Sequence, residues 1–231
     1  MTHMSGFHKR SGSVRRKLWY ALCYVLLAPA LLLRGLHLLG FETMGKALCL
    51  IPGLAGMWLR RAWYKATLAH CGENLYVDFL AAIRTPKTCI GNDVYIGHSC
   101  WIGWVDIGDD VMLGGHIVVL SGAAQHSFVR TDIPMRQQEG CASQVKIGRD
   151  VWVGNGAIIA ADVAEGCVVG AGSVVTKTFP AFSMIAGVPA RLVRSRLEPD
   201  PSGRSSPPSN AEACGHIAGL TGLTGEGATS T

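Results

Sequence analysis

Aliphatic residues recur at intervals of about six along the middle of the chain, and most are followed by glycine or alanine. This period differs from the 3.6 residues of an amphipathic helix and from the 2 residues of a half-buried strand. It is typical of a solenoid whose coils each contain three short strands, with one aliphatic side chain per strand pointing into a narrow interior. The aliphatic positions are Ile90, Ile96, Ile102, Ile107, Leu113, Val119, Ile147, Val153, Ile159, Val163, Val169 and Val175. The sequence therefore predicts a parallel β-helix of about four coils.

A second series of small or β-branched residues falls four places after many of these positions and predicts another inward-facing side chain. Its members are Val94, Cys100, Val111, Ile117, Val151, Ala157, Cys167 and Ser173. A β-sandwich, the main alternative, would place its turns at irregular spacings of about 8 to 12 residues. The repeat breaks at about Ala123 and resumes at Ile147, so we expect a loop over residues 124–146 that leaves the prism between two coils.

The first seventy residues carry a different pattern, which predicts helices. Residues 18–33 are uncharged and nearly all apolar, and a second apolar stretch, broken by Gly and Pro, covers residues 36–59. A helix needs about twenty apolar residues to cross a hydrocarbon core, whereas the first run is shorter and contains Pro29. We therefore expect a helix lying in a membrane interface, with a helical cap packed on the prism as the alternative. A cleaved signal peptide fits less well, because the mature chain would open on three leucines from Leu31.

The composition is that of a folded protein in three regions. With 48% hydrophobic and 16% charged residues, the 231-residue chain can bury a substantial core. The regions are a basic and apolar helical segment over 1–70, a repeat domain over 71–196, and a tail over 197–231 that is rich in Pro, Ser, Gly and Thr and is expected to be disordered. The eight cysteines show no CxxC pair, which indicates reduced packing residues of a cytosolic protein.

The formal net charge of +5 comes mostly from one cluster near the N-terminus. This cluster consists of Lys9, Arg10, Arg15, Arg16 and Lys17. Because it adjoins an apolar run, it suits an anionic membrane face better than nucleic acid, whose recognition also needs base-reading side chains. We therefore expect no nucleic-acid partner and a cytoplasmic protein with peripheral contact to the inner face of the cytoplasmic membrane.

Three motifs in the second half of the chain carry a family resemblance. They are IGRDVWVGNGAII from residue 147, VGAGSVVTK from residue 169 and AGVPAR from residue 186. In this order they resemble the C-terminal half of the hexapeptide-repeat acetyltransferases, which include maltose, galactoside and exopolysaccharide acetyltransferases. The resemblance covers residues 71–196. It implies a left-handed parallel β-helix, acetyl-CoA as acyl donor, and a homotrimer whose donor sites lie in grooves between neighbouring prisms.

The predicted loop contains His126, which opens the segment HSFVRTDIPMRQQEG. This segment resembles the loop that carries the catalytic histidine in the family. A neutral alcohol is a poor nucleophile, and an imidazole that accepts the hydroxyl proton accelerates attack by about 10² to 10⁴. Functional residues also concentrate on loops held by rigid scaffolds, so we predict His126 as the general base, with a merely solvated histidine as the alternative. Ser127 replaces the proline that commonly follows this histidine in sugar acetyltransferases, which favours the exopolysaccharide or xenobiotic branch.

The resemblance also implies donor contacts and an aromatic residue beside the acyl group. The implied acetyl-CoA contacts are Asn155, Ala171, Thr176, Lys177, Arg191 and Arg194. Small residues permit close approach of a pantetheine arm to the backbone, and cations near the C-terminal end suit the nucleotide phosphates. Trp152 resembles the aromatic residue that the family often has beside the acyl site. The alternative is a purely structural role, in which Trp152 caps a corner of a coil.

Two other histidines raise a rival function, because the scaffold also resembles that of gamma-class carbonic anhydrases, which bind zinc through three histidines. His98 and His116 are eighteen residues apart, about one coil. They follow their aliphatic residues by two and three places, so we expect them to be corner residues that point in different directions. A zinc site would also leave the motifs that end at Lys177 and Arg191 without a role. The sequence therefore predicts no metal.

The predicted function is transfer of an acetyl group from acetyl-CoA to a hydroxyl of a saccharide, either a polysaccharide or a lipid-linked sugar precursor. In the family, an acidic or amide residue of the preceding coil orients the acceptor. Here that stretch, residues 102–106, is shortened and offers no match, so the acceptor and the choice between O- and N-acetylation stay open. The alternatives are a xenobiotic or antibiotic acetyltransferase, a serine acetyltransferase, a carbonic anhydrase-like zinc enzyme and a noncatalytic hexapeptide scaffold.

Overall fold

The structure is a computed structural model and describes residues 14–199. The chain divides into two compact units, Met1–Ser195 and Arg196–Thr231, and every helix and strand given below lies in the first. The predicted tail beyond residue 199 and the basic residues Lys9 and Arg10 lie outside the part of the chain that the structure describes.

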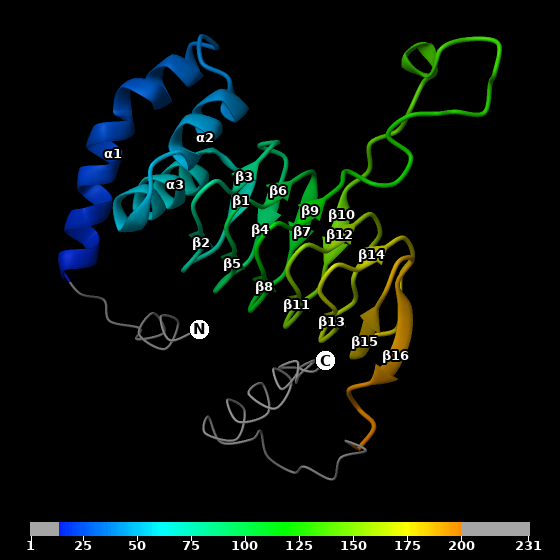
Figure 1. Ribbon diagram of the computed structural model, residues 1–231. Helices are drawn as coiled ribbons and strands as arrows, with labels where there is room; N and C mark the ends of the chain where they lie inside the picture. Colours follow the sequence, from blue (N-terminus) through cyan, green and yellow to red (C-terminus); the bar gives the residue numbers. More distant parts are fainter. Residues whose placement is uncertain (1–13, 200–231) are drawn as a thin grey trace, which may run out of the picture. The chain divides into compact units, whose positions relative to one another are not determined.

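Most of the first unit is a parallel β-helix of about six turns, whose three sheets run along the prism (Figure 1). Sheet A contains β1 (His70–Cys71), β4 (Cys89–Ile90), β7 (Val105–Ile107) and β10 (Val145–Ile147). Sheet B contains β2 (Tyr76–Val77), β5 (Tyr95–Ile96), β8 (Met112–Leu113), β11 (Trp152–Val153), β13 (Val168–Val169) and β15 (Ser183–Ala186), and ends in the antiparallel strand β16 (Arg191–Ser195). Sheet C contains β3 (Ala82–Ile83), β6 (Trp101–Ile102), β9 (Val118–Val119), β12 (Ile158–Ile159) and β14 (Val174–Val175).

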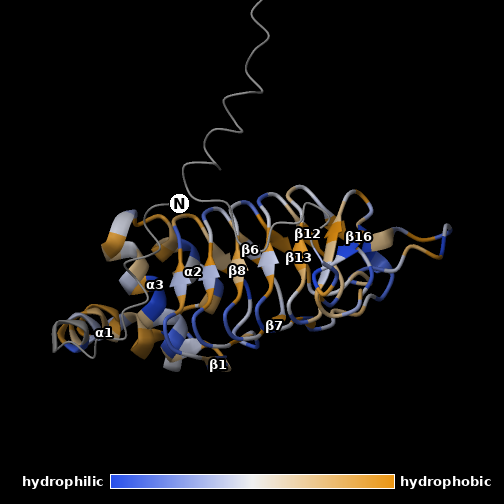
Figure 2. Ribbon diagram, turned by 90° about the horizontal axis from the view of Figure 1, so that it is seen from below, coloured by the Kyte–Doolittle hydropathy of each residue, from blue (hydrophilic) through white to orange (hydrophobic). Residues whose placement is uncertain are grey.

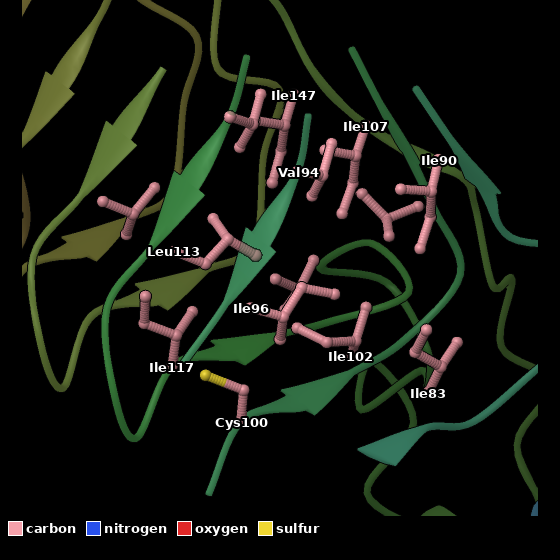
Figure 3. Close-up of a cluster of buried hydrophobic side chains, with 14 of the residues drawn as sticks. Ile83, Ile90, Val94, Ile96, Cys100, Ile102, Ile107, Leu113, Ile117 and Ile147 are labelled. Atoms are coloured by element: carbon pink, nitrogen blue, oxygen red, sulfur yellow. The ribbon is translucent and has the colours of Figure 1, made fainter. Parts of the chain in front are cut away.

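Both predicted series of inward-facing residues form the core. Ile90, Ile96 and Ile102 are fully buried, and Figure 3 shows their side chains converging with those of the neighbouring coils. Every member of the second series is buried as well, including Cys100 and Ser173. A six-residue period places one such pair on every face of the prism, so the interior is filled without an amphipathic helix or an alternating strand. The predicted fold class is therefore confirmed.

The prism is longer than the four coils that the repeat predicted. An additional coil, formed by β1 to β3, precedes Ile90. Its strands are followed by Gly72, Asp78 and Arg84, so charged residues stand where two of the small corner residues would be. At the other end, β15 continues sheet B by pairing with β13 but does not keep the spacing of six. The pattern thus revealed only the regular central coils.

Three helices precede the prism: α1 (Val14–Gly35), α2 (Phe41–Cys49) and α3 (Gly53–Thr67). α2 contacts β3, and α3 contacts β1 and β2. Phe41, Trp63 and Tyr64 are buried in the same core as the interior of the prism. The hydroxyl of Tyr64 accepts a hydrogen bond from the amide of Ile83 at 3.2 Å, and burial raises the pKa of Tyr64 to about 12. α2 and α3 therefore form the packed helical cap on the first coil.

A buried arginine joins this cap to the first coil. Arg60 of α3 is only 1% exposed. Its guanidinium donates hydrogen bonds to the carbonyl oxygens of Val77 (3.0 Å), Leu48 (2.9 Å) and Ile51 (2.8 Å). Burial lowers the pKa of Arg60, because desolvation disfavours the charged form. The three hydrogen bonds offset that cost and join α3 to the end of α2, to the segment between the two helices and to the first strand of sheet B, β2.

α1 is longer than the apolar run that predicted it. The helix continues through Pro29, and by length and composition alone its Lys17–Gly35 part, 19 residues, is sufficient to cross a membrane. The expectation that this segment is too short to span a membrane was therefore wrong. The helix extends beyond the uncharged run and includes Lys17 at one end and Arg34 at the other. On one side, Cys23 and Leu27 are buried in the common core. Figure 2 shows α1 as a largely hydrophobic helix at the end of the prism.

Candidate active site

The coils are interrupted by the segment 120–144, which connects sheet C to sheet A and projects away from the prism (Figure 1). It leaves at the edge between these two sheets, here called the C–A edge. The amide of Ser143 donates to the carbonyl of Ser121 at 3.0 Å, and that of Cys141 to the carbonyl of Ala124 at 2.8 Å. These bonds join the outgoing and returning arms into a narrow neck.

His126 lies at the outer end of this neck, and its side chain is exposed. Gly140 faces it across the neck: a Cβ there would meet the backbone of Gln125 and lie 2.7 Å from the Cα of His126. Only glycine permits such close approach of the two arms. Within residues 14–199 the imidazole of His126 has no hydrogen-bond partner. Its nitrogens are therefore open to a bound molecule or to another copy of the chain.

Beyond the neck, the side chain of Gln138 closes the tip of the segment. Its Oε1 accepts a hydrogen bond from the amide of Arg130 at 3.1 Å, while its Nε2 donates to the carbonyls of Arg130 (2.7 Å) and Ile133 (3.3 Å). Arg130 also forms an ion pair with Asp132 and lowers the pKa of that carboxyl group. The returning arm begins with a short 3-10 helix, η1 (Met135–Gln137). This clamp has no signal in the sequence, where Gln138 is one of two adjacent glutamines.

The tip nevertheless leaves large apolar side chains in solvent. They are Phe128, Val129 and Met135, with exposed fractions of 73%, 83% and 64%. A clamped backbone that presents apolar side chains outward is typical of a contact surface. The apolar side chains of the tip are therefore suited to contact another molecule, since they do not pack on the prism of their own chain.

The neck also holds a cysteine that sequence reasoning missed. Cys141 is exposed, and its backbone is bonded to Ala124, two residues before His126. The two residues are fifteen positions apart in sequence, so only the pairing of the arms reveals that they share the neck.

His98 and His116 meet at the edge between sheets B and C, here called the B–C edge. Their Nε2 atoms are 3.1 Å apart, with the ring planes at 85° and the ring centroids 4.6 Å apart. Both are corner residues, as predicted, but the expectation that they point in different directions was wrong.

The register of the coils explains this convergence. Ile96 pairs with Leu113, so His98 is level with Gly115 rather than with His116. Gly115 has no side chain, and a Cβ there would collide with the His98 ring. The ring therefore lies over Gly115 and reaches His116, whose backbone is left-handed with φ 59°. Counting places from the aliphatic residues missed that a neighbouring glycine leaves room for the ring.

The predicted donor contacts fall on two edges and one strand. Asn155 and Ala171 lie one coil apart on the B–C edge, where the Oδ1 of Asn155 accepts a hydrogen bond from the amide of Gly115 at 2.8 Å. Thr176 and Lys177 follow β14 on the C–A edge. There Thr176, Ala160 and Leu120 occupy equivalent positions in three successive coils, and Leu120 is the first residue of the projecting segment. Two coil spacings, about 10 Å in all, therefore separate Thr176 from the start of that segment.

Arg191 and Arg194 lie on β16, at the C-terminal end of the prism, and Lys177 is exposed at the same end with its Nζ 5.4 Å from the ring centroid of Phe179. None of these three cations forms an ion pair with an acidic residue in the described part of the chain. Together they give this end of the prism an uncompensated positive charge.

Trp152 is not a corner residue. It lies on the outer face of sheet B, 45% exposed, between Met112 and Val168 of the neighbouring coils. Sheet B is the face of the prism opposite the C–A edge, from which the segment with His126 projects. A single chain therefore does not bring Trp152 and His126 together, whereas it does place His126 and Lys177 along one edge.

Three kinds of comparison place this chain among known proteins. Residues 87–121 and 144–177 match the family described as "Hexapeptide repeat of succinyl-transferase". Nodulation protein L of Rhizobium meliloti (strain 1021) is 36% identical over 162 residues, which cover 60% of this chain and 84% of that protein. Galactoside O-acetyltransferase of Escherichia coli (strain K12) is 28% identical over 147 residues, covering 58% of this chain and 68% of that protein.

A solved structure shares the fold. The crystal structure of a maltose O-acetyltransferase from Clostridium difficile 630 superposes with a TM-score of 0.61 and 22% sequence identity, covering 68% of this chain and 86% of that one. The coiled prism, the matched repeats and the relative covered over most of its length agree with the motifs read from the sequence. This chain therefore belongs to the hexapeptide-repeat acetyltransferases, a family of acyl-CoA-dependent enzymes.

Proposed function

We propose that this enzyme transfers an acetyl group from acetyl-CoA to a hydroxyl group of a saccharide, with His126 as the general base. The name of the galactoside O-acetyltransferase relative supports the reaction and the acceptor class. The observation that carries the proposal is the placement of His126. Its side chain is exposed and has no hydrogen-bond partner among residues 14–199. Its backbone is held in the neck, where only a glycine at position 140 permits the close approach of the two arms.

The transfer can be written with every bond and proton accounted for. The acceptor oxygen forms a bond to the thioester carbonyl carbon while its proton passes to the imidazole of His126. Collapse of the tetrahedral intermediate breaks the carbon–sulfur bond, and the imidazolium returns the proton to the departing thiolate. Neither a metal nor a covalent acyl-enzyme is needed for this balance, so one imidazole at the acceptor hydroxyl accounts for the chemistry.

The proposal includes a homotrimer in which the projecting segment of one chain lies against the prism of the next. Phe128, Val129 and Met135 offer an apolar contact surface, and the open nitrogens of His126 would then face a groove lined by the neighbour. In this arrangement Trp152 of one chain and His126 of another lie at one site, which a single chain does not allow.

A thiol-release assay tests the reaction itself. Purified enzyme is supplied with acetyl-CoA and a panel of sugars, nucleotide sugars, serine and antibiotic alcohols. We expect release of free CoA with a saccharide and with no other class. Release with serine or with a drug alone would identify one of the alternative acceptor classes, and failure to bind acetyl-CoA would favour a noncatalytic scaffold.

The donor site is proposed to run along the C–A edge to the cationic end of the prism. Charge-assisted hydrogen bonds to phosphate are among the stronger polar contacts, about 1.5 to 3 kcal/mol each. Lys177→Ala and Arg191→Ala should therefore each raise the KM for acetyl-CoA by about 10- to 100-fold. The kcat should change much less, because a phosphate contact far from the thioester stabilises bound substrate and transition state alike.

Steady-state kinetics with varied acetyl-CoA measures both constants. Lys146→Ala is the matched control, since Lys146 is an exposed lysine of β10 on sheet A. Loss confined to kcat, or an equal effect in the control, would contradict a role of Lys177 and Arg191 in binding the donor.

The enzyme is further proposed to be cytoplasmic and attached peripherally to an anionic membrane through α1. The face of α1 opposite Cys23 and Leu27 is apolar as well, and a helix that is hydrophobic all round is typical of a buried or membrane-bound position. Its exposed large hydrophobic residues are Leu18, Trp19, Leu22, Val25, Leu26, Leu32 and Leu33, and the exposed Leu36 follows the helix directly. The first 41 residues contain no acidic side chain. Because one side of α1 is packed into the protein core, the helix fits a surface position better than a span.

Sedimentation of the full-length chain with vesicles tests this attachment. We expect binding to vesicles with anionic lipid, partial release by high salt, and full release by alkaline carbonate. Changing Arg15, Arg16 and Lys17 to Glu should remove the salt-sensitive part, about 1 kcal/mol per cation at most. Val25→Glu should weaken the apolar part, while Met112→Glu on sheet B serves as control. Resistance to carbonate would instead show that α1 crosses the membrane.

A further inference from the structure

The histidine pair on the B–C edge has no role in the proposed acetyl transfer. His126 projects from a different edge of the prism, and the transfer needs only one imidazole. Yet His98 and His116 are both exposed and present their Nε2 atoms to each other at 3.1 Å. One nitrogen can donate a hydrogen bond to the other, or both can offer a lone pair to a third atom.

The distance fits two ligands of one metal ion. Zinc binds imidazole nitrogen at about 2.0 to 2.1 Å in tetrahedral geometry, which separates two ligand nitrogens by about 3.3 Å. The observed 3.1 Å differs from this by only a few tenths of an ångström. We propose that His98 and His116 form a two-imidazole binding site for a borderline divalent transition-metal ion of the Zn²⁺ class. The proposal is independent of the role of His126.

The corner is built in a way that holds the two rings together before any metal binds. Gly115 leaves the space that the His98 ring fills. Its amide donates to the Oδ1 of Asn155, and the amide of His116 donates to the carbonyl of His98 at 2.8 Å, so both backbone segments are fixed. A preorganised pair binds a metal with less loss of side-chain entropy than two independent histidines on a mobile loop.

The ligand types define which ions fit. Imidazole suits zinc, copper and nickel, whereas magnesium and calcium prefer oxygen ligands. The nearby thiol of Cys100 is not a ligand: it donates to the carbonyl of Gly114 at 3.0 Å, and burial raises its pKa to about 11. Among the described residues no cluster of three or more potential ligands is present. The remaining coordination positions are therefore filled by water or by an oxygen or nitrogen atom from a bound molecule.

Calorimetric titration with Zn²⁺ tests the site in the full-length chain, purified without a histidine tag and treated with a chelator. We expect one binding event per chain that His98→Ala and His116→Ala each weaken at least about tenfold. His70→Ala, which removes another exposed histidine, should leave this event unchanged. Mg²⁺ should produce no comparable heat. In a parallel sample, Co²⁺ should give visible absorption bands that disappear in the same two variants.

A third variant separates geometry from the number of histidines. Gly115→Ala retains both imidazoles, but its methyl group displaces the His98 ring. We expect it to weaken Zn²⁺ binding about as much as loss of one histidine, with thermal unfolding close to that of the parent protein. Equal Zn²⁺ affinity in the parent, His98→Ala and His116→Ala proteins, or no binding by the parent, would overturn the proposal. Unchanged binding by Gly115→Ala would overturn the convergent geometry.

Discussion

Replacing His126 by alanine should lower kcat by at least about 10²-fold while the KM for acetyl-CoA and the oligomeric state stay nearly unchanged. A general base accepts the hydroxyl proton in the transition state. Its loss therefore removes stabilisation of the transition state and little of the ground-state binding. Thiol release at saturating acetyl-CoA measures the effect, and light scattering reports the assembly. Turnover close to that of the parent enzyme would refute the assignment.

A companion variant tests whether the neck positions this histidine. Gly140→Ala keeps the imidazole, but its methyl group would collide with the backbone of Gln125, so the two arms must separate. We expect kcat to fall by about tenfold or more with little change in thermal stability, since the segment lies outside the prism. Ser127→Ala is the control, because Ser127 adjoins His126 but forms no hydrogen bond across the neck among the described residues. Full activity in Gly140→Ala would mean that the neck does not position His126.

The largest expected loss of stability follows from Arg60→Met. Methionine fills much of the arginine volume but donates no hydrogen bond, so the carbonyls of Val77 and Ile51 lose their guanidinium partner, while that of Leu48 keeps its bond from the amide of Ile51. A buried acceptor without a partner costs about 1 to 3 kcal/mol, and the relief of a buried charge offsets part of this sum. We expect a net loss of about 2 to 4 kcal/mol and a thermal midpoint lower by roughly 5 to 10 °C.

Arg149→Met is the matched control for this variant. Arg149 interacts with the carboxylate of Asp110 at 3.4 Å, and both side chains are largely exposed. Such a pair contributes at most about 1 kcal/mol. Equal midpoints for Arg60→Met and Arg149→Met, by differential scanning calorimetry, would show that the buried arginine does not hold the helical cap on the first coil.

The regular coils were predictable because the physics that forms them is local. An inward aliphatic residue and a small corner residue are needed in every hexad, so Ile90, Ile96 and their successors reveal the prism directly. The repeat pattern did not predict the first coil, because α2 and α3 cover this coil. Packing against the helices, with Arg60 and Tyr64 bonded to its strands, stabilises it in place of a regular corner sequence.

The candidate site was only partly predictable. His126 stands where the repeat breaks, a local signal, but the pairing of Gly140 with Gln125 and the clamp of Gln138 depend on how two distant arms meet. His98 and His116 converge because of the register between two coils and a glycine on the intervening corner. Contacts that depend on register between segments leave no periodic trace in the sequence.

The two ends of the solenoid are closed by different means, which limits how the chain can associate with itself. A parallel coil exposes unpaired backbone groups at its first and last turns, to which an identical coil could add indefinitely. Here α3 covers the first turn, and the antiparallel strand β16 ends sheet B after β15. Among the described residues, neither terminus of the prism therefore offers a bare parallel coil on which an identical coil could stack, and the lateral faces are the surfaces suited to a closed assembly.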